Sequence, residues 1–345
     1  MLKTPILALA ALLICSPAVD ADTSVPLFDN HDLLEVTLTA EFPAIFRERD
    51  QTKSKYHPAT LSYTDDSGNP VTIPVNIKTR GQFRLQRENC RYPLLFWGFD
   101  TGDVTETIFA GQDVLPVTTH CQSSRRYEQY LLQEYLAYRL FQTLTERSFH
   151  LRLMQIKYVN KKKLRTKGTF YAFALENWDA LAERLGATRI EPEKFNPLNG
   201  NPFDTVLMNV FQYMIGNTDW SAVYGHNIVL LEDVDSGSIT PLPFDLDSTG
   251  VVDPLYATPG ENLPIRSVRQ RLYRGLCRPD EHYFPVFDRF RERKTLAYDL
   301  YRQQDGLSKR ERDRTLRYFD LFYEIIDSPE ESRRQIMDRC RRFKP

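Results

Sequence analysis

The chain has 345 residues, of which 41% are hydrophobic and 26% charged, a composition that excludes a disordered or collagen-like protein. Its 45 lysines and arginines nearly balance 46 aspartates and glutamates, so binding to nucleic acid through a chain-wide basic field is not expected. A local basic patch is still compatible with this balance. The length allows one large two-lobed unit or two domains.

Residues 1–21 have the pattern of a secretory signal peptide. Lys3 precedes an apolar run over residues 5–14, and small residues favour cleavage after Ala21. The run is too short for a stable membrane anchor, and no later stretch reaches transmembrane length. Lipid attachment at Cys15 is the alternative, which Ile14 disfavours because such signals have a small residue there. The mature protein is expected to be exported, to the periplasm or the cell exterior.

Four cysteines remain after cleavage, and an even number in an oxidising compartment predicts two disulfides with three possible connectivities. We favour pairing within each half of the chain, Cys90 with Cys121 and Cys277 with Cys340. No Cys-x-x-Cys spacing is present, so a zinc site is not expected.

The amino-terminal half is predicted to be rich in strands. Apolar residues alternate around a turn at residues 65–69, which is typical of a hairpin. A helical stripe follows over residues 126–144, and two further strand-like runs come after it. The expected strands cover residues 34–38, 59–63, 71–77, 93–99, 153–159 and 169–175. Together they predict an antiparallel sheet with one inserted helix.

The carboxy-terminal half is predicted to be mainly helical. Asn201 and Pro202 form an N-cap and a first-turn proline, and seven apolar residues then recur at helical spacing from Phe203 to Ile215. Gly216 ends this helix, whose apolar stripe is expected to be buried, with Gln212 pointing away from it. Farther on, an arginine-rich helix over residues 309–317 and a capping box at residues 328–331 are expected.

Polar residues after this helix follow an order that suits phosphoryl transfer. Asp219 lies in the loop, Asn227 opens a predicted hairpin over residues 228–243, and Asp245 and Asp247 follow the hairpin. In phosphoryl transfer one carboxylate orients or deprotonates the attacking hydroxyl, while an amide oxygen and a second carboxylate hold Mg²⁺. A lone Asp-x-Asp is more often a surface turn. The prediction therefore rests on the order of all these residues along the chain.

The chain departs from ordinary protein kinases in three respects. Asp219 and Asn227 are eight residues apart rather than five, no His-Arg-Asp precedes them, and no Gly-x-Gly-x-x-Gly loop is present. These departures exclude an ordinary protein kinase and leave an atypical one.

Three motifs resemble the signature of the CotH family, the spore-coat-protein-H-like secreted kinases. They are Gly216-Asn217-Thr218-Asp219-Trp220, His226-Asn227-Ile228 and Pro243-Phe244-Asp245-Leu246-Asp247. Residues 79–84 and the helix 131–140 are similar to further parts of that family. The resemblance implies an atypical protein-kinase-like fold, ATP with Mg²⁺ or Mn²⁺, and phosphorylation of a hydroxyl on a protein acceptor. It makes Asp219 the catalytic aspartate and Asp245 and Asn227 metal ligands, with Asp247 a further candidate ligand.

A kinase also needs a cation on the nucleotide phosphates, usually paired with a glutamate of a helix. Lys78 and Arg80 are candidates for the cation and Glu134 for its partner, although all three also fit as surface charges. Arg84 and Arg91 are further candidates. The segment Glu176-Asn177 stands where an adenine-binding hinge is expected, and a simple strand end is equally compatible.

These observations predict an α+β protein with a two-lobed protein-kinase-like fold. We expect a strand-rich lobe over residues 22–176 with an antiparallel sheet and one helix, and a helical lobe over residues 177–345 that carries the catalytic-type loop. Two other functions stay open: a catalytically silent envelope or scaffold protein, and a glycosyltransferase that uses Asp245-x-Asp247 to hold a metal and a sugar nucleotide. The missing alternation of strands and helices in the amino half disfavours the glycosyltransferase. The phosphate acceptor and the oligomeric state are not specified by the sequence.

Overall fold

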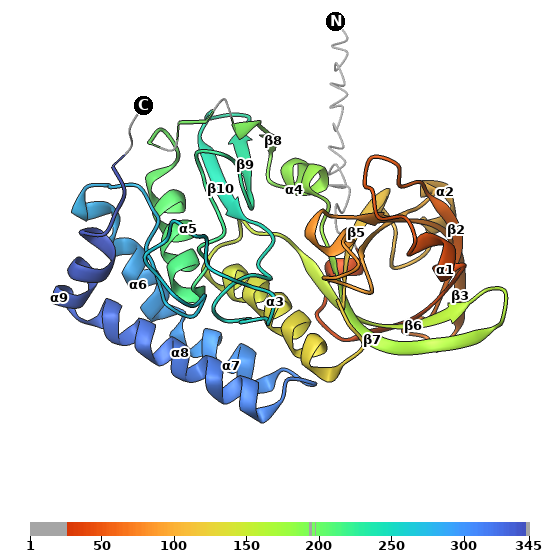
Figure 1. The fold of residues 1–345 in the computed structure, drawn as a ribbon. Coiled ribbons are helices and arrows are strands. Elements are labelled where there is room, and N and C mark those ends of the chain that lie inside the picture. Colours follow the sequence, from red (N-terminus) through yellow and green to blue (C-terminus); the bar gives the residue numbers. More distant parts are fainter. Residues whose placement is uncertain (1–25, 193–194, 197, 343–345) are drawn as a thin grey trace, which may run out of the picture.

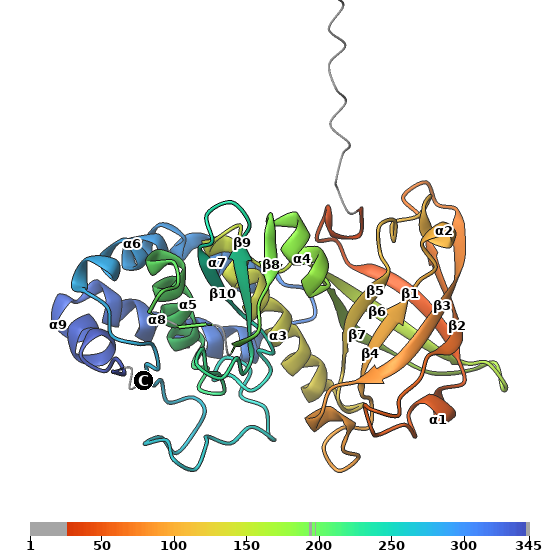
Figure 2. The same cartoon turned by 90° about the horizontal axis from the view of Figure 1, so that it is seen from above.

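The computed structural model describes residues 26–192, 195–196 and 198–342. The predicted signal peptide and Cys15 lie outside the described residues. Figures 1 and 2 show a β-barrel at one end of the molecule, the C-terminal helices at the other end, and the long helix α3 between them. Each end has its own large cluster of buried hydrophobic side chains.

Seven strands close the barrel, in the order β1-β2-β3-β4-β5-β7-β6. All neighbouring pairs are antiparallel except β1 and β6, which run parallel and close the barrel. Alternate side chains of the strands fill its interior. The strands are β1 (Leu34–Ala40), β2 (His57–Thr64), β3 (Pro70–Arg80), β4 (Leu94–Gly98), β5 (Val114–Thr119), β6 (Leu151–Asn160) and β7 (Arg165–Leu175).

The predicted two-lobed kinase-like fold is wrong, because the amino-terminal part is a closed mixed barrel rather than an open antiparallel sheet. The cause lies in the connection from β5 to β6 through α3 (Arg125–Leu144), which brings β6 to the free edge of β1 in parallel. Period-two alternation marks strands without naming their partners. Strand β5 was also missing from the prediction, since it contains Pro116 and is buried at every position from Leu115 to Thr119.

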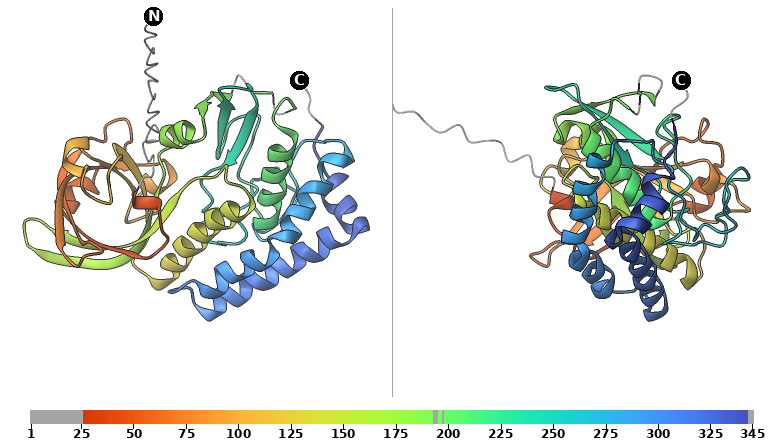
Figure 3. Two further views of the ribbon diagram at one scale, coloured as in Figure 1. Left: turned by 180° about the vertical axis from the view of Figure 1, so that it is seen from behind. Right: turned by 90° about the vertical axis from the view of Figure 1, so that its left-hand side faces the viewer.

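Helix α3 contributes its side chains to the helical cluster rather than to the barrel interior. By sequence α3 lies before the predicted domain boundary at residue 176, yet it packs with the helices that come after that boundary. The boundary itself stays a prediction. The longer helices of this part are α5 (Pro202–Ile215), α6 (Phe284–Glu292), α7 (Lys294–Gln303) and α8 (Lys309–Asp327). Figure 3 shows α6–α9, drawn in blue, at the end of the molecule opposite the barrel. The short helices are α1 (Phe42–Ile45), α2 (Thr101–Val104), α4 (Trp178–Arg184) and α9 (Pro329–Ser332), with single turns at η1 (Pro26–Phe28), η2 (Phe83–Leu85), η4 (Asp280–His282) and η5 (Arg333–Met337).

Helix α5 has the boundaries that its sequence predicts. The Asn201 side chain accepts a hydrogen bond from the backbone of Asp204, and Gly216 ends the helix in the left-handed conformation with φ 68°. The expectation for Gln212 is wrong, because its side chain is fully buried. Helix α5 is surrounded by other elements of the helical part, so both of its faces are covered.

A second, three-stranded sheet lies beside α5, in the order β10-β9-β8. Its strands are β8 (Ala187–Arg189), β9 (Ile228–Asp233) and β10 (Ile239–Pro243). The antiparallel pair β9 and β10 confirms the hairpin predicted for residues 228–243. The arginine-rich helix is also confirmed, as α8. Ser328 is the predicted N-cap of α9, where its hydroxyl accepts from the backbone of Glu331, whereas the Glu331 carboxylate accepts from Arg334 and Gln335.

Both predicted disulfides are present, Cys90–Cys121 and Cys277–Cys340. In the described part of the chain no helix is long and apolar enough to cross a membrane. Two disulfides are consistent with an exported protein, because they persist in oxidising compartments.

Burial of Phe211 at the centre of α5 gives a first test of the helical core. Its ring is fully buried and lies 4.7 Å from that of Phe141 on α3, measured between centroids. We expect Phe211→Ala to lower the free energy of unfolding by about 3–5 kcal/mol. Phe284→Ala is the matched control, since Phe284 is 51% exposed. Equal effects of the two changes in denaturant titrations would contradict the described core.

Acid should destabilise the fold through His120. This side chain is fully buried and contacts the rings of Tyr92 and Phe170, and neither ring nitrogen has a hydrogen-bond partner among the described residues. Burial lowers the pKa of His120 from 6.5 to about 3, so below pH 6.5 the unfolded chain binds a proton that the folded chain excludes.

Stability is therefore lost as the pH falls from 6.5 towards 3, by about 1.4 kcal/mol per pH unit from this residue. Between pH 6.5 and 5 the loss amounts to about 2 kcal/mol. We expect His120→Phe to flatten the pH dependence of the free energy of unfolding by that amount. An unchanged slope in the variant would show that His120 is not buried in its neutral form.

Candidate functional site

A cleft of about 1750 Å³ lies where the barrel meets the β9–β10 hairpin and the loop after α5. Asp219, Asn227, Asp245 and Asp247 all line this cleft. Its other walls come from the residues that follow β3, from residues 256–263 and 272–274, and from the C-terminal segment near Arg339 and Arg341. The predicted metal and catalytic residues are thus brought together.

Close backbone packing at the end of α5 fixes the loop that carries Asp219. Gly216 accepts a hydrogen bond from the backbone N–H of Gly250 at 3.1 Å, which ties this loop to the segment after Asp247. A Cβ at Gly216 would lie 2.3 Å from the Tyr318 hydroxyl, and one at Gly250 would lie 2.6 Å from a backbone oxygen. Both positions therefore require glycine.

The register of the hairpin places Asn227 beside the segment that carries Asp245. Ile228 at the start of β9 pairs with Pro243 at the end of β10, and the Phe244 N–H donates to the Asn227 backbone oxygen at 3.0 Å. Asn227 and Asp245 both have left-handed backbones, with φ 53° and 52°. Such conformations are uncommon outside glycine and are found disproportionately at functional sites.

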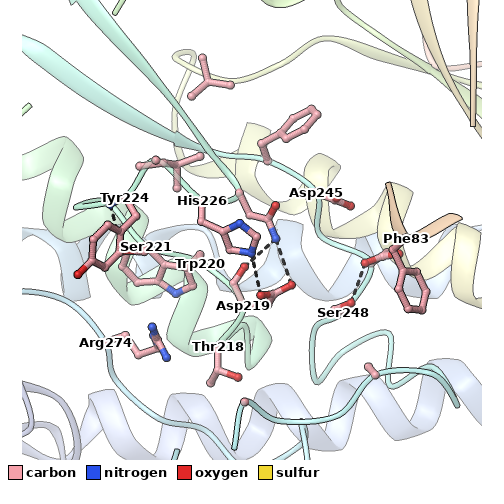
Figure 4. A pocket seen from close by; sticks show the side chains of 18 of the residues that line it. Phe83, Thr218, Asp219, Trp220, Ser221, Tyr224, His226, Asp245, Ser248 and Arg274 are labelled. Carbon is pink, nitrogen blue, oxygen red and sulfur yellow. Dashed lines mark hydrogen bonds and ion pairs between the residues drawn. The ribbon is translucent and has the colours of Figure 1, made fainter. Parts of the chain in front are cut away.

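Asp219 presents its carboxylate to the cleft, where 55% of the side chain is exposed. One carboxylate oxygen lies 2.9 Å from His226 Nε2, and the other accepts from Asn227 Nδ2 at 3.2 Å. The amide of Asn227 also donates to the Asp219 backbone oxygen at 2.7 Å. In Figure 4, Asp219 lies between Arg274 on one side and Asp245 and Ser248 on the other. The Asn227 amide oxygen is left free of these contacts.

The Asp245 carboxylate has neither a hydrogen bond nor an ion pair within the described residues. Its backbone N–H donates to the Tyr138 hydroxyl at 2.8 Å, which anchors the segment to α3. Burial and then the neighbouring Asp247 raise the pKa of Asp245 to about 6, while Arg84 and Arg80 oppose this shift. An unpaired carboxylate that borders a cleft is suited to a bound cation.

Arg84 is buried and joins the barrel, α3 and the Asp245–Asp247 segment. Its guanidinium donates to the Thr119 backbone oxygen at 3.1 Å, to Glu134 at 2.9 Å and to Asp247 at 2.9 Å. The same Asp247 oxygen accepts from the Tyr256 hydroxyl at 3.1 Å. Asp247 is therefore engaged in holding the cleft wall in this arrangement.

Glu134 forms an ion pair with Arg84, and not with Lys78 or Arg80, the two candidates that the sequence put first. Burial raises the pKa of Glu134 to about 8, and the Arg84 charge opposes that rise. Arg84 cannot fully compensate, because Glu134 and Asp247 share its one positive charge. One buried guanidinium thus holds two carboxylates from distant parts of the chain.

Arg80 lines the cleft and has no carboxylate within ion-pair distance in the described residues. Its Nε donates to the Leu95 backbone oxygen at 3.2 Å. Burial lowers the pKa of Arg80 to about 10, and the Asp245 charge partly offsets this. Gly81, with φ 92°, turns the chain after β3 so that both Arg80 and Arg84 reach the cleft.

Three other predicted residues do not line the cleft. Lys78 lies over the rings of Tyr56 and Phe96. Glu176 is buried, where it pairs with Arg184 at 2.7 Å and accepts from the His150 backbone. Arg91 lines a separate pocket. Their predicted role in nucleotide binding stays untested, and the cleft offers other groups for it.

Two residues that the sequence did not indicate also line the cleft. Trp178 follows the predicted hinge and packs against the ring of Phe244, with 6.1 Å between ring centroids. Arg274 has no carboxylate partner among the described residues, and the Asp219 charge acts on it. The only signal for Arg274 in the sequence is its position three residues before Cys277, in a segment that a disulfide ties down.

The oxygen donors of the cleft fit Mg²⁺ as a nucleotide-bound ion. Within the residues described, no three histidine, cysteine or acidic side chains are grouped so as to hold a metal by themselves. Mg²⁺ is usually held by one or two carboxylates, with substrate phosphates and water completing its shell. Asp245, with its unpaired carboxylate, and the amide oxygen of Asn227 match such a set.

Loss of Arg84 should lower the stability of the fold. Removing one member of a buried ion pair leaves an uncompensated charge, so we expect Arg84→Gln to cost about 3–5 kcal/mol of stability. The control is Arg302→Gln, which removes an exposed ion pair with Asp299 and should change stability by less than about 1 kcal/mol. Denaturant titration of both variants decides, and equal small effects would contradict the bridging role of Arg84.

No protein-family model matches the chain, and no curated protein is significantly similar to it. What the cleft can do is therefore inferred from its own side chains. The resemblance to the CotH family rests on the short motifs alone.

Proposed function

We propose that the protein transfers a phosphoryl group from ATP to a hydroxyl group of a protein acceptor, with Mg²⁺ bound to the nucleotide. One observation carries this proposal: Asp219, Asn227 and Asp245 border the same cleft as several arginines, among them Arg80 and Arg274, that have no carboxylate partner in the described part of the chain. Phosphoryl transfer needs positioned groups and compensating positive charge rather than covalent chemistry by the protein.

Asp219 is suited to orient the acceptor. Its exposed carboxylate is held by His226 and Asn227, so its direction is fixed while one side faces the cleft. As the acceptor oxygen attacks the γ-phosphorus and ADP leaves, the hydroxyl proton passes to this carboxylate.

Asp245 and Asn227 would hold the metal ion. Bound there with the nucleotide, Mg²⁺ would neutralise the charge that develops on the phosphate oxygens. The backbone of Asp245 is anchored on Tyr138, and that of Asn227 on Phe244. Both oxygen donors are thus presented from fixed positions, which a small cation with strict geometry requires.

Arginines rather than a lysine would bind the nucleotide phosphates. The described lining of the cleft contains no lysine, whereas Arg80 and Arg274 are available on two of its walls. The planar guanidinium matches phosphate oxygens in a bidentate manner. Trp178 and Phe244 offer an aromatic surface on which a purine ring can lie.

Membership of the CotH family is part of this proposal, because the motifs that resemble it supply Asp219, Asn227 and Asp245. A kinase-like fold is not part of it, since the amino-terminal part forms a closed barrel. Export to the periplasm or cell exterior belongs to the proposal as well and is consistent with the two disulfides.

A nucleotide-binding protein without turnover is the second candidate. Both carboxylate oxygens of Asp219 already accept hydrogen bonds, from His226 and Asn227. If these bonds persist when ATP is bound, the carboxylate is a weak base for an acceptor hydroxyl. Binding and transfer must therefore be measured separately.

The proposal predicts different losses for the two aspartates. Asp245→Asn should remove the Mg²⁺-dependent part of ATP binding in calorimetry, because the metal loses an anionic ligand. Asp219→Asn should bind ATP–Mg²⁺ almost like the parent while any phosphoryl transfer falls by ~10²–10⁴-fold. Transfer is followed with γ-labelled ATP and a mixture of exported proteins as acceptors.

A matched pair of cation variants completes the test. Arg80→Gln should weaken ATP binding by about tenfold or more, since a charged hydrogen-bond donor is lost. Lys78→Gln should leave it unchanged, because Lys78 does not line the cleft. The assignment is wrong if Asp245→Asn and Arg80→Gln both bind ATP–Mg²⁺ like the parent protein.

A further inference from the structure

A second pocket, of about 540 Å³, lies outside the cleft and shares no lining residue with it. One wall is formed by α1, the residues that flank it, and Arg91 and Tyr92 before β4. The other is formed by the end of β6, the start of β7 and the turn between them. Figure 2 shows α1 and the tip of the β6–β7 hairpin on the barrel, away from the helical part. The pocket therefore belongs to the barrel and needs its own explanation.

The lining of this pocket is strongly basic, although the chain as a whole is nearly neutral. Its lining holds six basic side chains against one acidic side chain, that of Glu41, whereas the chain as a whole has a net charge of −1. The basic residues are Arg47, Arg91, Lys162, Lys163, Arg165 and Lys167.

Most of this charge is uncompensated. Lys162 pairs with Glu41 at 2.9 Å. The other five basic side chains have no carboxylate within ion-pair distance in the described part of the chain. Like charges held together in one concavity repel one another, and a bound polyanion would relieve that repulsion.

The walls of the pocket are fixed rather than loose. The backbone N–H groups of Arg91 and Tyr92 both donate to the Cys121 backbone oxygen, next to the Cys90–Cys121 disulfide. On the other wall, the buried Asn160 side chain accepts from the Lys163 N–H at 3.2 Å. Tyr92 is buried and lines the pocket, and its hydroxyl group has no hydrogen-bond partner among the described residues. The backbone segments that carry the basic side chains are thus held in place.

We propose that this pocket binds a ligand that carries several clustered phosphate groups. Five uncompensated cations in about 540 Å³ call for a high density of negative charge. A phosphate monoester carries up to two charges per group, whereas a carboxylate polymer carries one per residue. The volume falls in the range of small-molecule sites, and arginine matches phosphate oxygens bidentately. This inference does not depend on the proposed phosphoryl transfer.

Two sources supply this chemistry, a free oligophosphate and the headgroups of an anionic lipid surface. Tripolyphosphate serves as the probe for the first, in calorimetry. Vesicles of phosphatidylglycerol, with phosphatidylcholine vesicles for comparison, serve for the second, in co-sedimentation. We expect binding that weakens as salt is raised, because exposed charges are screened within about 10 Å at 0.1 M ionic strength.

Two double variants isolate the pocket. Lys163→Gln with Arg91→Gln removes two cations from its walls. Lys161→Gln with Arg87→Gln removes one lysine from the same β6–β7 turn and one arginine from the segment before β4, and neither residue lines the pocket. All four side chains are exposed, so melting temperatures should match that of the parent.

The first double variant should lose about tenfold or more in affinity for the probe, while the second should bind like the parent. Loss with tripolyphosphate assigns a free oligophosphate, and loss with phosphatidylglycerol vesicles alone assigns a lipid surface. Arg80→Gln, which alters the separate cleft, should leave this binding in place. Equal affinity of the two double variants, absence of binding to both probes, or equally tight binding of an oligoglutamate peptide would overturn the proposal.

Discussion

The buried guanidinium of Arg84 is the interaction on which the arrangement of the molecule depends. Side chains of β6 and β7 belong to the hydrophobic cluster of the helical part, so apolar packing attaches the barrel there, and Arg84 adds a buried polar connection at the cleft. Arg84 comes from the turn after β3 and holds Glu134 of α3 and Asp247 of the segment after β10. Because a buried charge is costly without partners, these three segments are constrained to meet.

Two backbone features then set the positions of the chemical groups. The contact of Gly216 with Gly250 ties the Asp219 loop to the segment after Asp247, and the hairpin register places Asn227 beside Phe244. Neither feature involves a side chain that takes part in the proposed chemistry. Asp219, Asn227 and Asp245 are thus placed by rigid elements, while Asp245 and the amide oxygen of Asn227 remain available for a cation.

Local patterns in the sequence predicted local structure well. The ends of α5, the β9–β10 hairpin and both disulfides follow from capping residues, alternation and the even number of cysteines. The closed barrel did not follow, because alternation says nothing about which strands pair, and β5 does not alternate at all. Gln212 was misplaced for a related reason, since a polar residue off the apolar stripe is buried when other elements cover both helix faces.

The same limit applies to the site. Asp219, Asn227, Asp245 and Asp247 line one cleft, as their order along the chain suggested. Among the basic candidates, no local pattern distinguishes Lys78, which lies over two aromatic rings, from Arg80, which borders the cleft. The sequence did not indicate Arg274 as a site residue, because its position depends on a segment that the Cys277–Cys340 disulfide holds in place.

In the proposed function, Asp245 and Asn227 form the cation side of a nucleotide site. Anomalous diffraction from crystals grown with Mn²⁺ and a non-hydrolysable ATP analogue tests it most directly, because Mn²⁺ replaces Mg²⁺ and is located without reference to the protein coordinates. We expect an anomalous peak within coordination distance of the Asp245 carboxylate and the Asn227 amide oxygen, with phosphates at Arg80. A peak elsewhere, or a nucleotide bound outside this cleft, would contradict it.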